Sequence, residues 1–548
     1  MDLAKTCSYK LDFNERCNSF PDWAKKALAE IDSQTLWRYP DRGQLESGLA
    51  KHYNLDAEQV LVTNGADEAI FLLLSLLGTT RPVILPQPTF SMYDIGAKQW
   101  QLNTINIAPN SEQGLDWQTL KAVQRKQPEA LVILVRPNNP SGETAPLDTL
   151  REILADAKRM KQDVVIDEAY VEFAGESALS LLGEFDNLLL LRTFSKAYGL
   201  AGLRVGYILA SAKSLLAAIR ERCLPFNVNS VSLAVAEQAL SAEAQQEVQA
   251  YCRTIAGNRE VLSSLFAKYK IPCSVSEGNF LLIRPSEQQK ALLLTLLVDA
   301  GISVRQFSSG DLAPYLRVTV NDDISVLTEV LRLAFEPELL CLDMDGVLID
   351  TSQSYDRAVQ ETVKHFSGKT VTEADILAKR MQGGFNNDWL LSQSLLADLG
   401  LDLPYEEVVE IFQGFYLGKD DKTGLIQAEK VLIEDDLRSK LKRYACCIVT
   451  GRPRHEAELG ARLCGLSDFP IISLDDVKEG KPDPEGINLA KAKKSAQRVW
   501  MCGDNVDDMQ AANAAQAVAI GIGNNPALSQ HQAKLILNNI NQLNALLP

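Results

Sequence analysis

The sequence has few of the residues from which proteins build disulfide frameworks or zinc sites. Its ten cysteines include no Cys-x-x-Cys pair, and Cys446 and Cys447 are adjacent, which suits neither a disulfide framework nor a tetrahedral metal site. Its four histidines are scattered between positions 52 and 531, without the spacing of a zinc site. We therefore expect reduced thiols and a cytoplasmic protein.

Long apolar runs and a basic surface are also missing. The longest mainly apolar runs, 70–77 and 291–298, are much shorter than the about 20 residues of a transmembrane helix. The start of the sequence mixes both charge signs and contains no apolar signal core. The net charge of −16 leaves no basic excess to neutralise a phosphate backbone or anionic lipid. The sequence therefore predicts neither a membrane nor a nucleic-acid partner.

What is present is typical of globular α/β domains. The chain has 548 residues, of which 46% are hydrophobic and 23% charged, and single cores stop growing near about 250–300 residues. Short apolar runs alternate with helical patterns, first through VLVT, VILP, LVILV, VVID, LLLL and VGYIL, and again through LLCLD, CCIVT, VWMCG and AVAIGIG. Such runs are typical of strands in a mostly parallel sheet that is covered on both faces.

The two series of apolar runs meet at a proline. Pro337 follows an amphipathic stretch and directly precedes the next apolar run, and a proline there ends a helix. We predict one domain at 1–337 and another at 338–548, with almost no linker between them. Residues from about 351 to 444 carry mainly helical patterns and are expected to form an insert in the second domain.

Several polar residues of the first half fall at the ends of predicted strands. Lys196 follows the run 188–191, where a lysine can form a Schiff base with an aldehyde cofactor. Asp167 ends another run, where a carboxylate can hold a pyridinium nitrogen protonated. Asn139 follows a third, and residues 65–67 enter a helix whose N–H groups can receive a phosphate. Taken singly, each also suits an ordinary surface lysine, cap or loop residue.

The order of these segments carries a resemblance. GADE, PTFSMY, PNNPSG, DEAY, TFSKAYGLAGLRVG, PFNVN and YLRVTV resemble the motifs of fold type I pyridoxal-phosphate aminotransferases, specifically the histidinol-phosphate aminotransferase family, over about 9–335. The resemblance implies a large, mostly parallel sheet with a small domain and pyridoxal 5'-phosphate as cofactor. It also implies a phosphorylated small molecule and a 2-oxoacid as substrates.

The resemblance assigns a role to each matching residue. It implies Lys196 for the Schiff base and for proton transfer, and Arg317 for an anionic end of the substrate. Tyr39 would reach the cofactor phosphate of a neighbouring subunit, which implies a homodimer. The remaining cofactor contacts implied are Asp167 at the ring nitrogen, Asn139 and Tyr170 at the ring oxygen, Phe90 on the ring face, and Ala66, Asp67, Thr193, Ser195 and Arg204 at the phosphate.

Two departures from the family pattern leave the substrate open. The family's Asn-Glu-Asn-Pro start is replaced by Asn-Glu-Arg-Cys at 14–17, and a Gly-Thr-Arg-Glu run by Asn-Asp-Asp-Ile at 321–324, so a second arginine is missing. Histidinol phosphate is therefore one candidate, because fold and cofactor do not determine the substrate. The related threonine-phosphate decarboxylases share most of these motifs and provide an alternative.

The second half contains a cluster of carboxylates. Asp343 and Asp345 follow a predicted strand, and Asp504 and Asp508 follow another. Two carboxylates one residue apart suit a nucleophile with an acid/base, and several oxygen ligands suit Mg²⁺. A hydroxyl at Thr450 and an ammonium group on Lys481 can neutralise phosphoryl oxygens. Alone, the first pair also suits an acidic loop.

Together these segments resemble the four motifs of the haloacid-dehalogenase (HAD) superfamily, over about 339–547. The resemblance implies a Rossmann-like domain with a helical cap, Asp343 as nucleophile, Asp345 as acid/base, and Thr450 and Lys481 as phosphate ligands. It implies Mg²⁺ bound by Asp343, the Asp345 carbonyl, Asp504 and Asp508. The cap segment 379–389 is expected to contribute to substrate recognition.

We therefore expect a bifunctional α/β enzyme, an aminotransferase joined to a Mg²⁺-dependent phosphatase that acts on its phosphorylated product. One alternative retains the cofactor but makes the first half a decarboxylase. Another makes the second half a module that senses a phosphorylated ligand without hydrolysing it.

Overall fold

The computed structural model of the chain describes residues 9–17, 19–110, 114–382, 385, 387–419 and 423–547. Contacts divide it into two compact units, Met1–Pro285 with Gly301–Val326, and Ser286–Ala300 with Leu327–Pro548. Among the described residues, no helix is both long and apolar enough to cross a lipid bilayer.

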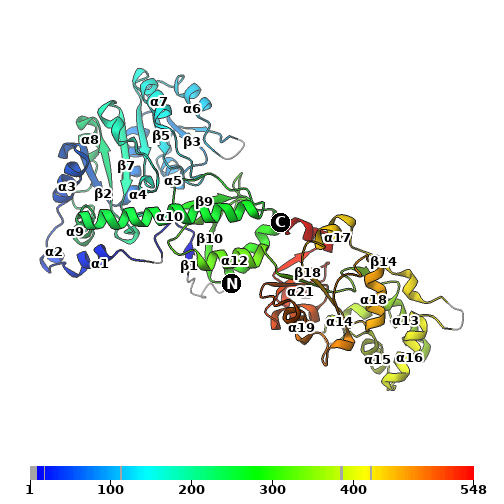
Figure 1. Cartoon of the computed structure of the whole chain (residues 1–548). Helices are drawn as coiled ribbons and strands as arrows, with labels where there is room; N and C mark the ends of the chain where they lie inside the picture. Colours follow the sequence, from blue (N-terminus) through cyan, green and yellow to red (C-terminus); the bar gives the residue numbers. More distant parts are fainter. Residues whose placement is uncertain are drawn as a thin grey trace. The chain divides into compact units, whose positions relative to one another are not determined.

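The first unit is built on a seven-stranded sheet (Figure 1). Most of its strands are buried, mainly apolar runs, as in sheets with both faces covered. Only β8 runs antiparallel to its neighbours, β2 and β7. The strands, in spatial order, are β2 (Val60–Thr63), β8 (Gly206–Ala210), β7 (Leu188–Thr193), β6 (Asp163–Asp167), β5 (Leu131–Val135), β3 (Val83–Pro86) and β4 (Thr104–Ile107).

A second, four-stranded sheet completes this unit, in the order β1 (Tyr9–Leu11), β10 (Ile302–Gln306), β11 (Leu316–Thr319) and β9 (Phe280–Ile283). The longest described helix, α10 (Ala242–Lys268), is drawn in green in Figure 1 and is capped by the Ser241 hydroxyl. The other helices are α1 (Asp22–Ala29), α2 (Gln34–Trp37), α3 (Gly43–Tyr53), α4 (Gly65–Leu73), α5 (Ser91–Gln99), α6 (Trp117–Gln124), α7 (Leu147–Arg159), α8 (Lys213–Arg220) and α9 (Ser230–Gln238).

The second unit contains an all-parallel six-stranded sheet. Its order is β16 (Ile471–Ile472), β15 (Cys446–Val449), β12 (Leu339–Leu342), β17 (Val499–Gly503), β18 (Val518–Ile522) and β19 (Leu535–Leu537). The flanking helices are α17 (Asp435–Leu441), α18 (Arg454–Leu463), α19 (Glu485–Lys494), α20 (Val506–Ala514) and α21 (Ala527–Gln530). By contacts, α11 (Glu287–Asp299) and most of α12 (Ser325–Phe335) also group with this unit.

The helical insert has a hydrophobic core of its own. It consists of α13 (Tyr355–Ser367), α14 (Glu373–Arg380), α15 (Asp388–Asp398) and α16 (Tyr405–Tyr416), and its core includes Val359, Leu391 and Phe412. The two chain segments that lead in and out pair as strands β13 (Ile349–Asp350) and β14 (Lys430–Val431). The packed insert is thus shorter than the predicted 351–444, since α17 contacts the C-terminal 3₁₀ helix Ile540–Ala545 instead.

Candidate active sites

In the first unit, the predicted cofactor residues other than Tyr39 gather at the edge of the sheet where β2, β3, β5, β6 and β7 have their carboxyl ends. They line a cavity of about 220 Å³, at the sheet edge where ligands bind in α/β folds. The lining residues are Phe13, Glu15, Ala66, Asp67, Phe90, Val135, Asn139, Asp167, Ala169, Tyr170, Thr193, Ser195, Lys196, Ala201 and Arg204.

Asp167 is the buried acid of this cavity. Tyr93 Oη donates to its Oδ2 at 2.9 Å, and the Ala169 N–H donates to Oδ1 at 3.1 Å. Burial raises the pKa of Asp167 to about 6, although the bond from Tyr93 acts in the opposite direction. A carboxylate in such a place gains most from a donor that carries positive charge, as a protonated pyridine does.

The N-terminus of α4 forms one wall of the cavity beside Arg204. Arg204 Nη2 donates to Asp67 Oδ2 at 2.5 Å, and a Cβ on Gly65, whose φ is +74°, would lie 2.6 Å from the same nitrogen. Only glycine allows both this backbone conformation and this approach. Thr193 Oγ1 donates to Ser195 Oγ at 2.8 Å. Helix N–H groups, hydroxyls and a guanidinium group thus converge as an anion site requires.

A hydrogen-bonded chain crosses from the cavity to the small sheet. The amides of Asn14 and Asn139 donate to Tyr170 Oη at 3.1 and 3.3 Å. Arg317 Nη1 donates to Asn139 Oδ1 at 2.5 Å, and Nη2 to the Asp12 carbonyl at 2.7 Å. Arg317 is buried, and burial lowers its pKa. It is therefore held by the cavity residues without being part of the lining.

Lys196 and Tyr39 lie in contrasting places. Lys196 Nζ donates to the Phe13 carbonyl at 2.9 Å and lies 5.6 Å from the centre of the Tyr170 ring. Tyr39 is 81% exposed, outside the cavity lining, and stacks on Phe226. The prediction that Tyr39 serves a neighbouring subunit therefore remains a prediction.

In the second unit, a buried lysine lies among three aspartates. Lys481 Nζ is 2.8 Å from Asp343 Oδ1 and 2.5 Å from Asp508 Oδ1. Oxygens of Asp343, Asp504 and Asp508 lie within 4.8 Å of one another, close enough to share one metal ion. Burial and the charge of Asp508 raise the pKa of Asp343 and of Asp504. A divalent cation would relieve this repulsion.

Two glycines allow the aspartates to approach so closely. Gly346 has a φ of +70°, and a Cβ there would lie 2.0 Å from Asp504 Oδ2. A Cβ on Gly503 would lie 2.3 Å from Asp508 Cγ. Asp508 is further fixed by a capping box at the start of α20, in which it and Asn505 bond each other's N–H groups.

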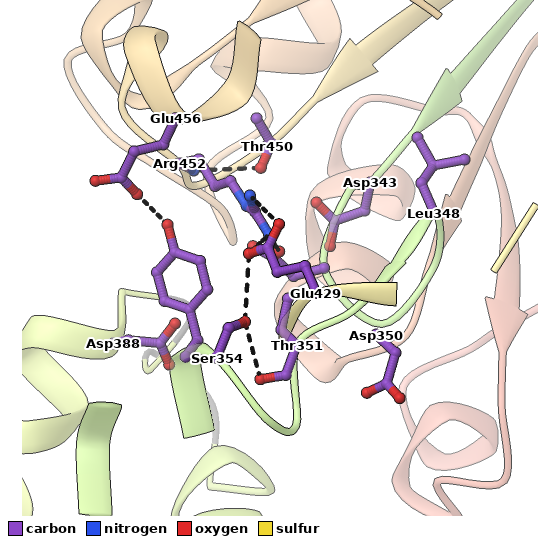
Figure 2. Close-up of polar contacts among 12 residues, drawn as sticks. Asp343, Leu348, Asp350, Thr351, Ser354, Asp388, Glu429, Thr450, Arg452 and Glu456 are labelled. Atoms are coloured by element: carbon purple, nitrogen blue, oxygen red, sulfur yellow. Dashed lines mark hydrogen bonds and ion pairs between the residues drawn. The ribbon is translucent and has the colours of Figure 1, made fainter. Parts of the chain in front are cut away.

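Asp345 does not share this cluster of side chains. Its Oδ1 accepts from Arg452 Nε at 2.8 Å and from Nη2 at 2.6 Å. Figure 2 shows Arg452 in contact with Thr450 and Glu429: its N–H donates to Thr450 Oγ1 at 3.2 Å, and Nη2 to Glu429 Oε1 at 2.8 Å. The metal role predicted for Asp345 concerns its carbonyl, and it stays a prediction.

The insert closes the other side of this site. A cavity of about 50 Å³ is lined by Asp345 and Asp504 from the core and by Arg380 and Asp388 from the insert. Arg380 is paired at 2.6 Å with Asp388 and at 2.7 Å with Asp356. Burial raises the pKa of Asp388 to about 6, despite the charge of Arg380. Of the predicted recognition segment 379–389, residues 383, 384 and 386 lie outside the described residues.

Comparison with known families identifies both halves. Residues 2–332 match the family described as aminotransferase class I and II. The chain belongs to this family. Residues 337–516 match the family described as haloacid dehalogenase-like hydrolase. The protein is therefore an aminotransferase fused to a HAD-type hydrolase domain, as the motifs predicted.

Curated relatives match the aminotransferase domain. Histidinol-phosphate aminotransferase 1 of Carboxydothermus hydrogenoformans is 37% identical over 319 residues, which are 57% of this chain and 88% of that protein. Histidinol-phosphate aminotransferase of Pyrococcus furiosus is 33% identical over 331 residues, which are 59% of this chain and 92% of that protein.

Solved structures show the fold of this domain. The histidinol-phosphate aminotransferase from Sinorhizobium meliloti, in complex with pyridoxal-5'-phosphate, aligns with a TM-score of 0.53 and 24% identity, covering 60% of this chain and 92% of that one. The L-threonine-O-3-phosphate decarboxylase from Porphyromonas gingivalis aligns with a TM-score of 0.50 and 22% identity, covering 59% and 97%.

The aminotransferase cavity fits the cofactor that its fold implies. It combines a buried acid with raised pKa at Asp167, an anion site at the start of α4, and Lys196 in the same lining. In the hydrolase domain, the three-aspartate cluster offers oxygen ligands that suit Mg²⁺.

Sequence reasoning missed several residues that the structure places at these sites. Tyr93 bonds Asp167, Asn14 bonds Tyr170 from 156 positions away, and Arg452 bonds Asp345. Tyr93 and Arg452 stand in segments already recognised, PTFSMY and IVTGRP, and Asn14 in the departing segment 14–17. The motifs could therefore have drawn attention to these residues, but only the fold shows which residues they bond.

Proposed function

We propose that the aminotransferase domain uses pyridoxal 5'-phosphate to transfer an amino group between a phosphorylated small molecule and a 2-oxoacid. The cavity lined by Lys196, Asp167 and the α4 N-terminus carries this proposal. When bound, the cofactor supplies an electron sink for negative charge at the substrate α-carbon.

In this proposal the chain's own residues hold the cofactor and move a proton. Asp167 binds the ring nitrogen, Asn139 and Tyr170 the ring oxygen, and Phe90 packs on the ring. Lys196 holds the cofactor covalently through Nζ and carries the α-proton when released. The phosphate ligands are the N-terminus of α4 at Ala66 and Asp67, together with Thr193, Ser195 and Arg204.

Arg317 is the proposed ligand for an anionic end of the substrate, and its Nε has no hydrogen-bond partner among the described residues. The named relatives and Arg317 together make L-histidinol phosphate the first substrate to test. Tyr39, exposed beside Phe226, would serve the cofactor phosphate of a second subunit in a homodimer.

We further propose that the hydrolase domain cleaves phosphomonoesters with Mg²⁺ held by Asp343, Asp504 and Asp508. Lys481 and Thr450 bind the phosphoryl oxygens. An oxygen of Asp343 attacks phosphorus while the bond to the alcohol oxygen breaks, and Asp345 gives that oxygen its proton. Water then attacks the acyl phosphate and returns a proton to Asp345. This second step releases inorganic phosphate and restores the Asp343 carboxylate.

The charges that line the cap side of this site favour an alcohol that carries a cation. Both arginines there are already paired with carboxylates: Arg380 with Asp356 and Asp388, and Arg452 with Asp345. Among the described residues of this lining, a second anionic group on the substrate therefore meets no unpaired arginine. An ammonium or imidazolium group meets Asp388 instead, where two carboxylates, Asp356 and Asp388, face the single arginine Arg380.

This charge argument yields a direct test. Under Mg²⁺, the protein is expected to hydrolyse L-histidinol phosphate or 2-aminoethyl phosphate with kcat/KM at least tenfold above that for phosphoglycolate, measured by phosphate release. Asp388→Asn should narrow this ratio, since it removes the paired carboxylate. A preference for phosphoglycolate in the unaltered protein would contradict the proposal.

The same amine phosphate is thus the proposed substrate of both halves. Spectral titration of the cofactor-loaded protein separately with L-glutamate and L-histidinol phosphate tests the first half. Carbon dioxide release from L-threonine-O-3-phosphate without a 2-oxoacid would identify a decarboxylase instead. Phosphate release that Asp343→Asn abolishes would exclude a purely sensing role for the second half.

A further inference from the structure

Arg452 is a fully buried cation whose donors are all directed at other residues of the hydrolase domain. Its side chain is 1% exposed. Nε and Nη2 both donate to Asp345 Oδ1, Nη2 also to Glu429 Oε1, and Nη1 to Tyr416 Oη at 3.3 Å and Glu429 Oε2 at 3.3 Å. The Tyr355 ring lies against it at 4.9 Å. Because every nitrogen is engaged, Arg452 has no donor left for a phosphoryl group.

Its two carboxylate partners come from different parts of the domain. Asp345 stands in the turn after β12, beside the proposed nucleophile. Glu429 directly precedes β14, on the segment that returns from the insert. Ser354, on the segment that enters the insert, donates to Glu429 Oε1 at 3.3 Å, as Figure 2 shows, and Tyr416 of α16 donates to it at 2.9 Å.

We propose that Arg452 is a positioning residue that fixes the orientation of Asp345, and that Glu429 ties this orientation to the two segments that carry the cap. The inference rests on the proposed phosphatase function. Both bonds from Arg452 fall on Oδ1 of Asp345, which leaves Oδ2 for the alcohol oxygen and the attacking water. A side chain with two fixed bonds to one oxygen cannot rotate without breaking an ion pair whose arginine is buried.

The role of Asp345 in the reaction provides a selective readout. Protonation matters when the leaving group is an alkoxide, but hardly when it is p-nitrophenolate, which is stable without a proton. Loss of Asp345 positioning should therefore slow the first chemical step for an alkyl phosphate and spare it for p-nitrophenyl phosphate. A variant that merely loosens the site should slow both substrates alike.

The experiment uses the full-length protein with Mg²⁺ and enzyme in excess over substrate, and it follows release of the alcohol, which reports only the first step of phosphate transfer. The substrates are p-nitrophenyl phosphate and the better of L-histidinol phosphate and 2-aminoethyl phosphate. Arg452→Gln is expected to slow the alkyl phosphate about 100-fold and p-nitrophenyl phosphate less than threefold, with the enzyme concentration for the half-maximal rate nearly unchanged. Asp345→Asn, which lacks the acid/base carboxylate itself, shows how the two rates change when that group is lost completely.

Three further variants keep the test decisive. Arg452→Lys places a single cation beside Asp345 and should recover part of the alkyl phosphate rate. Glu429→Gln retains Arg452 and should slow the alkyl phosphate about tenfold, even where Arg452→Gln fails to fold. Arg357→Gln, which removes an insert ion pair with Glu361 outside the site, should change neither rate.

The outcomes separate this inference from the function on which it rests. Equal slowing of both substrates in Arg452→Gln and in Glu429→Gln, or no slowing in either variant, overturns the positioning role while phosphatase activity stands. If the unaltered protein shows no Mg²⁺-dependent hydrolysis, the proposed function is overturned and this inference with it.

Discussion

At the scale of single residues, burial decides how the two sites use their charges. Asp167 is a buried carboxylate, and burial raises its pKa to about 6. Arg452, in contrast, is a buried cation that holds two carboxylates. Removing one member of such a buried ion pair leaves the charge of the remaining member uncompensated in a medium of low polarity.

The pKa of Asp167 predicts how cofactor binding depends on pH. In the proposed binding mode the carboxylate binds a protonated ring nitrogen, and a proton competes with that nitrogen as the pH falls through about 6. Affinity for pyridoxal 5'-phosphate should be highest above pH 6 and fall by up to about tenfold per unit below it. Fluorescence titration of the apoprotein between pH 5 and 8 measures this.

Asp167→Asn serves as the control for this prediction. It should bind the cofactor more weakly above pH 6 and lose the pH dependence that Asp167 causes. Tyr93→Phe removes a bond that lowers the pKa of Asp167, so the midpoint should move to higher pH. An unchanged profile in Asp167→Asn would show that another group titrates.

At the scale of elements, the turns after the strands shape both sites. The turn after β12 approaches Asp504 only because Gly346 has no Cβ. We predict that Gly346→Ala slows Mg²⁺-dependent phosphate release at least tenfold, since the new methyl group would displace Asp504, a proposed metal ligand. Amino transfer should be unaffected.

Gly368 provides a matched control for this substitution. It also has a positive φ, of +68°, but a Cβ there meets nothing within 4 Å. Both alanine variants should lose about 1 kcal/mol of unfolding free energy from the backbone conformation alone. Equal phosphatase activity in the two variants would contradict the steric argument.

The sequence predicted the central strands but not the short ones. Each of the ten quoted runs overlaps a strand, because continuous apolar runs are needed wherever both faces are covered. The missed strands are β1, β4, β9, β10, β11, β13, β14, β16 and β19. They include two-residue strands, such as β16, and partly exposed edges, such as β4.

The site residues that lie at the ends of strands could be predicted from the sequence, because ligands of α/β proteins bind at the carboxyl ends of strands. Asp167 is the last residue of β6, Asp343 directly follows β12, and Lys196 lies three residues after the end of β7. Arg452 and Glu429 could not be assigned partners from the sequence, because Glu429 and Asp345 meet only when the insert returns to the core. Long-range contacts of this kind have no local periodicity to reveal them.

At the scale of the whole molecule, the chain carries two chemistries with separate residues. Lys196→Ala should abolish amino transfer and leave Mg²⁺-dependent phosphate release within about twofold. Asp343→Asn should do the reverse, as each residue belongs to a different unit. Parallel assays of glutamate and phosphate on the same preparations check this. Loss of both activities in either variant would contradict separate sites.

The most direct measurement is one incubation of the cofactor-loaded protein with L-histidinol phosphate, 2-oxoglutarate and Mg²⁺, in which every product is followed by mass spectrometry. A shared substrate predicts that glutamate and inorganic phosphate both form, and that omission of Mg²⁺ stops only the phosphate. Glutamate without phosphate, or neither product, would contradict a single amine phosphate that serves both halves.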